Sequence, residues 1–460
     1  MTLRPALLVS LVLLTTLEAQ AAGRIPYGGE LRVAHPGPTE FTEPSLADSP
    51  LEATLYGLVS QPLCQWMPEG RAGPALAHGP SRPSPQVVRW SLPAPAQTQA
   101  LVRAWARLTG SEAPSPYRAL LFPLMGEGRQ LSASGDTLEL TLAFPWPDLE
   151  RSLCHPALAP PRSAPAALGP FSPSGTHTVD ARLAWPPGRP YVDRLRLQPT
   201  DERGLSRLWS TQGTQVALGV APDPGSSTGA ALYATYLAWS PRKVPSDFRQ
   251  AVERALDRED LTRLFVRGPA VPMPHLLPPE LMPQAPSPPS APPPGPSQAG
   301  RKVTLLYDTD NEDQRAVAER LQVKLHDLGY TVALTPLPRA GLRSRWASGD
   351  YEVMLHSLLL PPVPGPALAV VLDAAGRKDL LGVELPRIGA LPEPTARDAR
   401  VRERALALGP TLPLLPLYAQ GLALRAAPEI GGLIFDAQGL PRLDGVWLQP
   451  GAVGGSGARR

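Results

Sequence analysis

The chain lacks the sequence patterns that most often mark an enzyme. The zinc-protease pattern HExxH, the nucleophile pattern GxSxG, the P-loop and GxGxxG are all missing from its 460 residues. None of its seven histidines lies three or four residues from another, as paired metal ligands on a helix would. The sequence therefore predicts no enzyme, no catalytic residue, no metal site and no cofactor. An exported hydrolase stays a remote alternative, because a triad can assemble from distant residues.

Strong net charge and long apolar runs are absent as well. The formal charge is only +3, which gives no electrostatic reason to expect nucleic acid or an anionic membrane as partner. Beyond the N-terminus no segment holds 18 uncharged apolar residues, so no membrane-spanning helix is expected. The mature protein is therefore expected to be soluble outside the cytoplasm.

Cysteine is scarce, and Cys64 and Cys154 are the only two. In an oxidising compartment they can form a disulfide. Two buried free thiols fit the sequence equally well, because a chain of this length needs no covalent staple. The sequence leaves both alternatives open.

Proline, in contrast, is abundant. The chain has 61 prolines, where average usage would give roughly 23. Eight of them fall in residues 283–299, PQAPSPPSAPPPGPSQA, a stretch without any charge. Such a composition cannot pack a core, so this segment is predicted to be a polyproline-like or disordered linker.

The N-terminus has the layout of an export signal. Arg4 supplies a positive start, residues 6–17 are mostly apolar, and Ala19-Gln20-Ala21 fits the small-x-small cleavage rule. The apolar run is too short to span a bilayer comfortably. Residues 1–21 are therefore predicted to be a signal peptide cleaved near Ala21, which places the protein in the periplasm.

The rest of the chain alternates between strand and helix patterns. In residues 247–260, DFRQAVERALDRED, one apolar helix face ends and Asp257 is suited to cap a second helix. Residues 302–338 read as strand, helix and strand, a βαβ unit with a parallel pair. Further strands are predicted at 29–37, 86–93, 135–147, 191–200, 231–241 and 350–358, and helices at 50–66 and 98–110.

Taken in order, these pieces resemble the extracellular solute-binding proteins of the oligopeptide, dipeptide and nickel class, which deliver ligands to ABC transporters. The resemblance extends from about residue 28 to residue 450. It rests on the order of several short motifs: GGELRVA (28–34), GRPYVDRLRL (188–197), FRQAVERALDRED (248–260) and GDYEVML (349–355). Of these, FRQAVERALDRED matches the family best.

The resemblance implies an α/β fold with two lobes, the two-lobed periplasmic-binding-protein fold, in which mixed sheets are flanked by helices. The first lobe of this class carries an extra inserted domain. After the signal peptide, the implied division of the chain is lobe 1 at 22–58, the inserted domain at 59–167, lobe 1 again at 168–238, lobe 2 at 239–427 with the linker at 283–299, and lobe 1 with a disordered tail at 428–460.

The same resemblance implies a function. The protein would be the periplasmic solute-binding component of an ABC importer, a monomer that captures a small or peptide-like ligand between hinged lobes and presents it to the permease. A sensor or interaction protein on the same scaffold, without transport, is the alternative. The ligand-binding residues expected from the family order are Asp48, Ser49, Trp239, His356 and Ser357.

One departure from the family pattern bears on the ligand. Peptide-binding relatives carry an aspartate just after the strand that corresponds to 350–358, and it pairs with the ligand's amino terminus. Here that place holds residues 358–362, LLLPP. An enclosed ammonium without a carboxylate nearby is costly, so we expect no binding of free peptides by their amino terminus there. Asp48 or Asp373 is the expected source of any compensating carboxylate.

Overall fold

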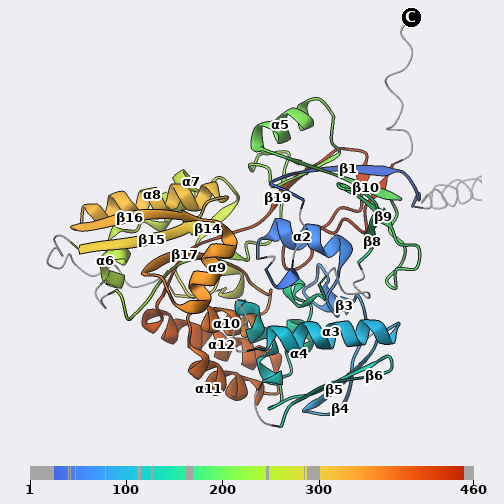
Figure 1. Cartoon of the computed structure of the whole chain (residues 1–460), viewed down its shortest axis with the longest axis horizontal. Coiled ribbons are helices and arrows are strands. Elements are labelled where there is room, and N and C mark those ends of the chain that lie inside the picture. The colour runs from blue at the N-terminus through green and yellow to red at the C-terminus, as the bar shows by residue number, and fades with distance from the viewer. Residues whose placement is uncertain are drawn as a thin grey trace, which may run out of the picture.

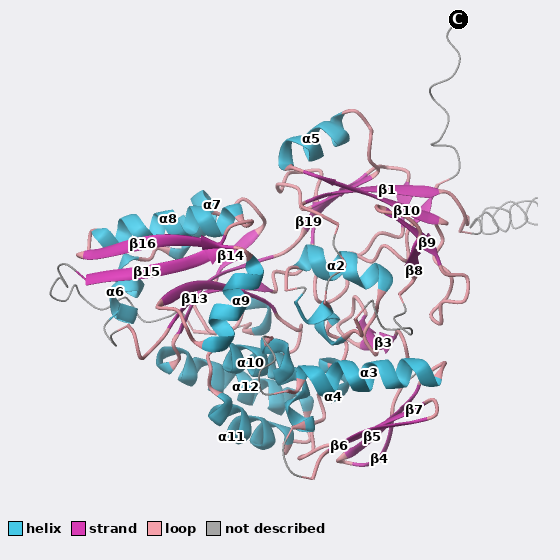
Figure 2. Cartoon of the chain, viewed as in Figure 1, coloured by secondary structure: helices cyan, strands magenta, loops and turns pink. Residues whose placement is uncertain are grey.

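The structure is a computed structural model that describes residues 25–39, 41, 43–46, 48–77, 79–110, 115–125, 128–161, 169–244, 248–283, 285–286 and 301–449. The predicted signal peptide and almost all of the predicted linker lie outside these residues. Within them, three sheets of four or more strands organise the chain (Figures 1 and 2). We call the bodies around them lobe 1, the inserted domain and lobe 2.

Lobe 1 is built on a seven-stranded mixed sheet in the order β12-β19-β11-β1-β10-β9-β8. Its centre is β1, where Leu31 and Val33 are fully buried on one face of the sheet and Ala34 is fully buried on the other, so both faces of this central strand are covered. The elements are β1 (Glu30–Pro36), α2 (Pro50–Val59), β8 (Phe171–Pro173), β9 (Thr178–Ala181), β10 (Arg194–Thr200), α5 (Glu202–Ser210), β11 (Val216–Leu218), β12 (Ser227–Thr228), β19 (Ala423–Ala426) and the small pair β20 (Ile430–Gly431) and β21 (Trp447–Leu448).

The inserted domain follows α2 and carries a four-stranded antiparallel sheet in the order β4-β5-β7-β6. Leu138 and Leu140 of β7 are fully buried, which confirms the alternating pattern of the predicted strand at 135–147. The elements are β2 (Cys64–Trp66), β3 (Ala72–Pro74), β4 (Ser81–Ser84), β5 (Val87–Ser91), α3 (Pro95–Leu108), η2 (Pro116–Leu124), β6 (Gln130–Ser134), β7 (Thr137–Thr141), α4 (Leu149–Ser152) and η3 (Pro156–Leu158), with η1 (Pro44–Leu46) close to η3.

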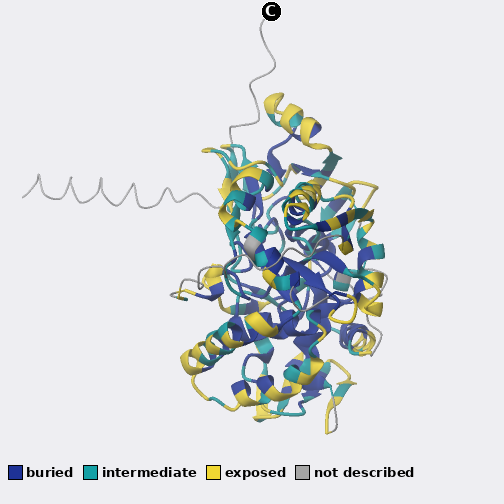
Figure 3. Cartoon of the chain, turned by 90° about the vertical axis from the view of Figure 1, so that its left-hand side faces the viewer, coloured by how far each residue is buried: buried dark blue, intermediate teal, exposed yellow. Residues whose placement is uncertain are grey.

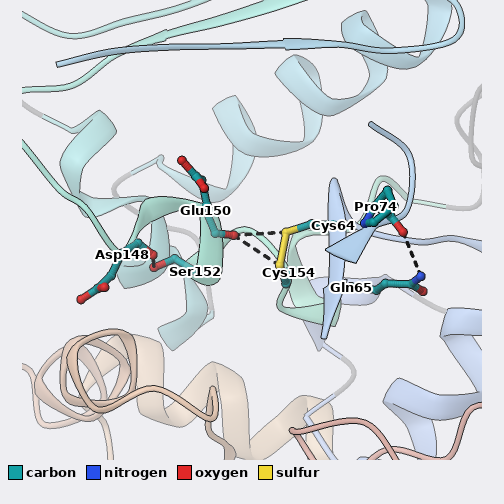
Figure 4. Close-up of a disulfide and its surroundings, with 7 residues drawn as sticks. All are labelled: Cys64, Gln65, Pro74, Asp148, Glu150, Ser152 and Cys154. Atoms are coloured by element: carbon teal, nitrogen blue, oxygen red, sulfur yellow. Dashed lines mark hydrogen bonds between the residues drawn. A yellow bond between two sulfur atoms is a disulfide. The ribbon is translucent and has the colours of Figure 1, made fainter. Parts of the chain in front are cut away.

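The two cysteines form a disulfide at the neck of this insertion (Figure 4). The bond joins Cys64 to Cys154 across 90 residues of sequence, and both sulfur atoms lie against the carbonyl oxygen of Glu150, at 3.1 and 3.3 Å. Of the two alternatives that the sequence leaves open, the structure therefore contains the disulfide.

Lobe 2 has a six-stranded mixed sheet in the order β14-β18-β13-β17-β15-β16. β15 and β16 pair in parallel and are connected by α8, which confirms the predicted βαβ unit. The elements are β13 (Tyr233–Trp239), α6 (Phe248–Ala255), α7 (Arg258–Phe265), β14 (Ala270–Pro272), η4 (Pro279–Leu281), β15 (Arg301–Asp308), α8 (Glu312–His326), β16 (Tyr330–Leu337), α9 (Arg339–Ser348), β17 (Val353–Leu359), α10 (Pro364–Ala374), α11 (Lys378–Gly389), α12 (Pro394–Leu408), η5 (Gly409–Thr411) and β18 (Leu414–Gln420).

The helix pair predicted from residues 247–260 is present as α6 and α7. Asp257 caps α7, because its side chain accepts a hydrogen bond from the backbone N–H of Asp260. Phe248 and Val252 of α6 are fully buried in the core of lobe 2. The apolar face read from the sequence is therefore a packing face.

The structure differs from the sequence-based expectations at several element and lobe boundaries. The helix predicted for 50–66 ends at Val59, because Ser60 is already extended and Pro62 cannot continue a helix. The chain enters lobe 2 with β13, before the expected boundary at 239, and it returns to lobe 1 between β18 and β19, before 427. The order of motifs along the chain does not determine which strands pair, so it cannot locate these boundaries to the residue.

The inserted domain and lobe 2 share one buried core, although the insertion is encoded within lobe 1. α10 packs against η2, and apolar residues of both bodies belong to one contiguous buried cluster. Figure 3 shows buried residues concentrated in the middle of the molecule. Two largely buried ion pairs cross the contact: Arg118 with Asp373 at 2.9 Å, and Arg397 with Asp148 at 3.3 Å.

Candidate functional site

A cluster of opposite charges lies where lobe 1 meets lobe 2, and we call it the interlobe cluster. Lobe 1 contributes Asp48 and Glu52, from the start of α2. Lobe 2 contributes Asp308 at the end of β15 and Arg339 and Arg343 from α9. Arg339 and Arg343 are four residues apart on a helix, so they share one face.

The ion pairs of this cluster connect the two lobes directly. Arg343 contacts the Asp48 carboxylate at 2.9 Å through Nη2 and donates to it from Nε at 3.2 Å. Arg339 contacts Glu52 and donates from Nε to Asp308 at 3.1 Å. These side chains are less than half exposed, so the surrounding water screens them only in part.

Capping explains why Asp48 is available for this contact. The side chain of Ser49, and not that of Asp48, accepts the hydrogen bond from the Glu52 backbone N–H and caps α2. Asp48 therefore directs its carboxylate toward α9, while Ser49 has a structural role at the helix start.

Burial and neighbouring charges together shift the pKa values of the groups in the cluster. Desolvation lowers the pKa of Arg339, but the nearby carboxylates of Asp48 and Glu52 outweigh it, so the pKa stands above its ordinary value. Desolvation raises the pKa of Glu52, and the Arg339 guanidinium offsets part of that rise. Arg339 is therefore charged throughout the physiological range.

His356 and Ser357 of β17 lie next to the cluster. Burial lowers the pKa of His356 to about 4, so its ring is neutral near pH 7, and it stacks on Trp346 at 5.6 Å between ring centroids. Ser357 shares a 2.8 Å hydrogen bond with Thr235 and accepts one from Gln314 at 3.0 Å. Ser357 is thus already bonded within the lobe.

Several buried polar atoms of this region form no hydrogen bond within the described residues: Glu52 Oε2, Arg339 Nη1, Arg343 Nη2 and His356 Nε2. The two guanidinium nitrogens contact carboxylates, but not in hydrogen-bonding geometry. Buried polar groups are normally paired with protein or water. Glu52 Oε2 and His356 Nε2 are therefore buried at the lobe boundary without a hydrogen bond, whereas the two guanidinium nitrogens are held by carboxylates.

Residues 358–362, where the resemblance places the contact with a ligand's amino terminus, are packed against the rest of the protein. Leu358, Leu359 and Leu360 are fully buried. The Leu359 N–H donates to the Tyr117 hydroxyl at 2.9 Å, and the Leu359 carbonyl lies 2.9 Å from Nε2 of His155. The Leu360 N–H donates to the Leu232 carbonyl, and its own carbonyl accepts from Gln438. These backbone groups are therefore already bonded internally.

The two carboxylates expected to compensate for the missing aspartate are also paired. Asp48 faces Arg343, and Asp373 is bound by Arg118 and is almost fully buried. A ligand ammonium at 358–362 would therefore find no unpaired carboxylate from these two residues.

The five residues expected to bind ligand fall into two places. Asp48, Ser49, His356 and Ser357 lie at or beside the interlobe cluster. Trp239 lies at the other end of β13, opposite Val353. It packs on Phe248 and lines a groove of lobe 2.

Sequence reasoning missed Glu52, Asp308, Arg339 and Arg343. A signal for the arginines was present, because RAGLRSRW (339–346) places two arginines four residues apart. Without a partner in view, such a pair reads as a solvated helix face. No signal in the sequence pointed to Asp308. Its role depends on the end of β15, which places its carboxylate beside Arg339.

Within the described residues, no group of three or more histidines, cysteines or carboxylates is arranged to hold a metal ion. In the same part of the chain, none of the helices has the length and apolar character needed to cross a bilayer.

Comparison with known proteins assigns the family. A profile of bacterial extracellular solute-binding proteins, family 5 middle region, matches residues 95–376, which is more than half of the chain. No curated protein sequence matches the chain.

Solved structures with the same fold cover nearly the whole chain. The periplasmic binding protein DppA of Helicobacter pylori, in complex with the peptide STSA, has a TM-score of 0.74 at 14% identity and covers 92% of this chain and 99% of its own. The Escherichia coli murein tripeptide binding protein MppA has a TM-score of 0.74 at 17% identity, with the same coverage. NikA of Staphylococcus aureus, in complex with Ni(L-His)2, has a TM-score of 0.72 at 12% identity and covers 91% of this chain and 100% of its own. At these identities the likeness shows the fold alone, but together with the profile match it leads to one conclusion: the chain belongs to family 5 of the bacterial extracellular solute-binding proteins, the non-enzymatic binding proteins that serve ABC transporters.

Proposed function

We propose that the protein is the periplasmic solute-binding component of an ABC importer and captures a small ligand between lobe 1 and lobe 2. The observation that carries the proposal is the interlobe cluster. Lobe 1 carboxylates face lobe 2 guanidiniums, and buried polar atoms around them have unused hydrogen-bonding capacity. Opposite charges on two facing lobes support a hinged closure in which these ion pairs form as the lobes meet.

Closure moves lobe 1 relative to a larger body in this proposal. Lobe 2 and the inserted domain share their core, so they travel together, and the interlobe ion pairs form and break. Asp48, His356 and Ser357 are the proposed ligand contacts, with Arg339 and Arg343 added from the structure. Ser49 supports the site by fixing the start of α2.

The ligand class follows from the wall at 358–362. We propose that the protein does not bind free peptides by an amino terminus held there, because that segment has no carboxylate and its bonded backbone is buried. Calorimetry with di- to pentapeptides, free and N-acetylated, tests this. Tight binding of the free peptides that acetylation abolishes would restore the ordinary peptide-binding interpretation.

A thermal-shift screen tests the function itself. The library should contain peptides, N-acetylated peptides, opines and nickel–histidine complexes. A ligand at 100 times its Kd stabilises the native state by about 2.7 kcal/mol, which raises the melting temperature measurably. Asp48→Ala and Arg343→Gln should weaken a ligand that the screen identifies. Arg400→Gln changes a partly exposed arginine of α12 away from the interlobe cluster and should leave the ligand's affinity unchanged.

The same scaffold without transport is the second candidate, as a sensor or interaction protein. The ion pairs between the lobes favour it, because they hold the two faces together without a guest. If no compound class binds at millimolar concentration, solute capture is refuted and this second function stands.

A further inference from the structure

A groove that none of the interlobe-cluster residues line lies in lobe 2 at its contact with the inserted domain, which contributes Arg118. It has a volume of about 790 Å³ and lies where β13, α9 and α10 end and where the chain approaches β18. Trp239 lines it, whereas Thr235, opposite Ser357, is four residues earlier on the same strand. That spacing puts Trp239 about 13 Å along β13 from Thr235. A cavity of this size is in the range of ligand sites.

The walls of the groove are aromatic and held in place. Trp239 and Trp346 are 6% and 8% exposed. The Trp346 indole N–H donates to the carbonyl of Ala374 at 2.9 Å, which ties α9 to α10. Arg249 lies over the Trp239 ring at 5.7 Å and donates to the Leu412 carbonyl. Both indoles are therefore fixed in position, and each presents only a small part of its surface to an occupant.

The groove has an excess of positive charge. Five cations line it, and Asp373 is its one lining carboxylate: the cations are Arg118, Arg242, Arg249, Arg377 and Lys378. Arg118, Arg249 and Arg377 are paired with Asp373, Glu253 and Asp379.

Two of these cations remain without an ion pair in the described part of the chain. Arg242 and Lys378 are exposed and both line the groove. The nearby Asp350 does not neutralise them, because Lys243 and Arg345 already share its carboxylate. The groove therefore favours an occupant with negative charge.

We propose that this groove docks an acidic peptide segment of a partner protein. Carboxylates of the segment pair with Arg242 and Lys378, and its apolar side chains contact the small exposed part of the two indoles. The groove is open along its rim, where Ser348, Gly349 and Gly376 are exposed, so a chain can enter and leave at its ends. This fits a peptide segment better than a small anion. The proposal goes beyond solute capture and does not depend on the identity of the solute.

α9 gives such docking a connection to the cleft. Its first half carries Arg339 and Arg343 to lobe 1, and its last turn forms a wall of the groove. A partner seated in the groove therefore touches the helix that the interlobe ion pairs hold.

The test uses a dye-labelled, C-amidated hexapeptide of alternating glutamate and leucine, blocked at its amino end, with the lysine–leucine peptide as the charge-reversed control. Fluorescence anisotropy at low salt should show saturable binding of the acidic probe only. Arg242→Glu combined with Lys378→Glu should weaken it by at least about tenfold, since two charge pairs become repulsive. The matched control is Arg103→Glu combined with Arg387→Glu, which changes the net charge equally at two exposed arginines outside the groove. It should change the affinity less than twofold.

Three outcomes would overturn the proposal. One is no binding of the acidic probe at 1 mM. Another is equal weakening by the groove and control pairs, which would mean non-specific attraction. The third is competition by glutarate at the affinity of the hexapeptide, which would make the groove a small-anion site. Asp48→Ala should leave probe binding intact, so failure of the proposed solute site is distinguishable from failure of the groove.

Discussion

Replacing Arg397 by methionine should loosen the contact between the inserted domain and lobe 2. Arg397 on α12 is 4% exposed, and its Nη2 lies 3.3 Å from Asp148, which is 1% exposed. Its Nη1 also donates to the carbonyls of Leu391 and Pro392, at 3.0 and 2.7 Å. The substitution removes the charge partner and two hydrogen bonds but leaves a side chain that fills space.

The magnitude follows from what is left behind. Breaking a buried ion pair by removing one member costs about 3 to 5 kcal/mol, because the remaining charge is buried alone. Here Asp148 keeps a second, more exposed partner in Arg151. We therefore expect the lower end, about 3 kcal/mol of unfolding free energy. Arg400→Met is the matched control on the same helix, and its exposed pair with Glu403 is worth about 0.5 kcal/mol or less.

Urea unfolding followed by circular dichroism and by tryptophan fluorescence measures both variants. Because lobe 2 and the inserted domain share one core, we expect them to unfold in a single transition. The urea midpoint of that transition should shift equally by circular dichroism and by fluorescence in Arg397→Met. The double variant Arg397→Met/Asp148→Leu should recover part of the loss, since it removes the orphaned carboxylate. The reasoning fails if Arg397→Met is no more destabilising than Arg400→Met, or if the inserted domain unfolds in its own unshifted transition.

Four further outcomes are expected. Burial lowers the pKa of His155 from 6.5 to about 4, so the folded state takes up this proton at a lower pH than the unfolded state. The stability that this difference provides is present above pH 6.5 and is lost as the pH falls toward 4, by at most about 3 kcal/mol. The unfolding free energy of His155→Gln should therefore depend less on pH in this range. Replacing Cys64 and Cys154 by serine should lower the unfolding free energy by about 2 to 5 kcal/mol, and dithiothreitol should no longer affect the variant's urea midpoint. Limited proteolysis should cut within or beside residues 283–299 while both lobes survive, and uniform resistance there would contradict the linker prediction. N-terminal sequencing of exported protein should begin within a residue or two of Ala22, and a mature chain that retains Met1 would contradict cleavage.

The fold was predictable where the sequence kept a clear period. Alternation identified β1, β7 and β10, and the steps of three and four identified α6 and α8. α10 escaped because every one of its residues is buried, so it has no polar face to produce a period. α11 contains Pro386, which reads as a helix breaker in isolation.

The candidate site was predictable only in part, for a related reason. Asp48 and His356 were reached through the family order of motifs, and the structure places both at the lobe boundary. Arg339 and Arg343 depend on a contact with a residue nearly 300 positions earlier, and no local pattern encodes such a pairing. Trp239 was assigned by its place near the crossover. Its position along β13, which decides what it faces, follows from strand register.

The shared core limits how modular this protein is. The two chain segments that connect the inserted domain to lobe 1 are joined by the disulfide, so the insertion looks like a unit that could be exchanged between relatives. Yet η2 rests on α10, and a Cβ on Gly389 of α11 would stand 2.4 Å from the carbonyl oxygen of Pro145. Cutting the inserted domain out at the neck would expose the apolar surface that it now buries against lobe 2. Grafting a foreign insertion would therefore require redesign of α10 and α11, so these two helices and the insertion are expected to diverge together.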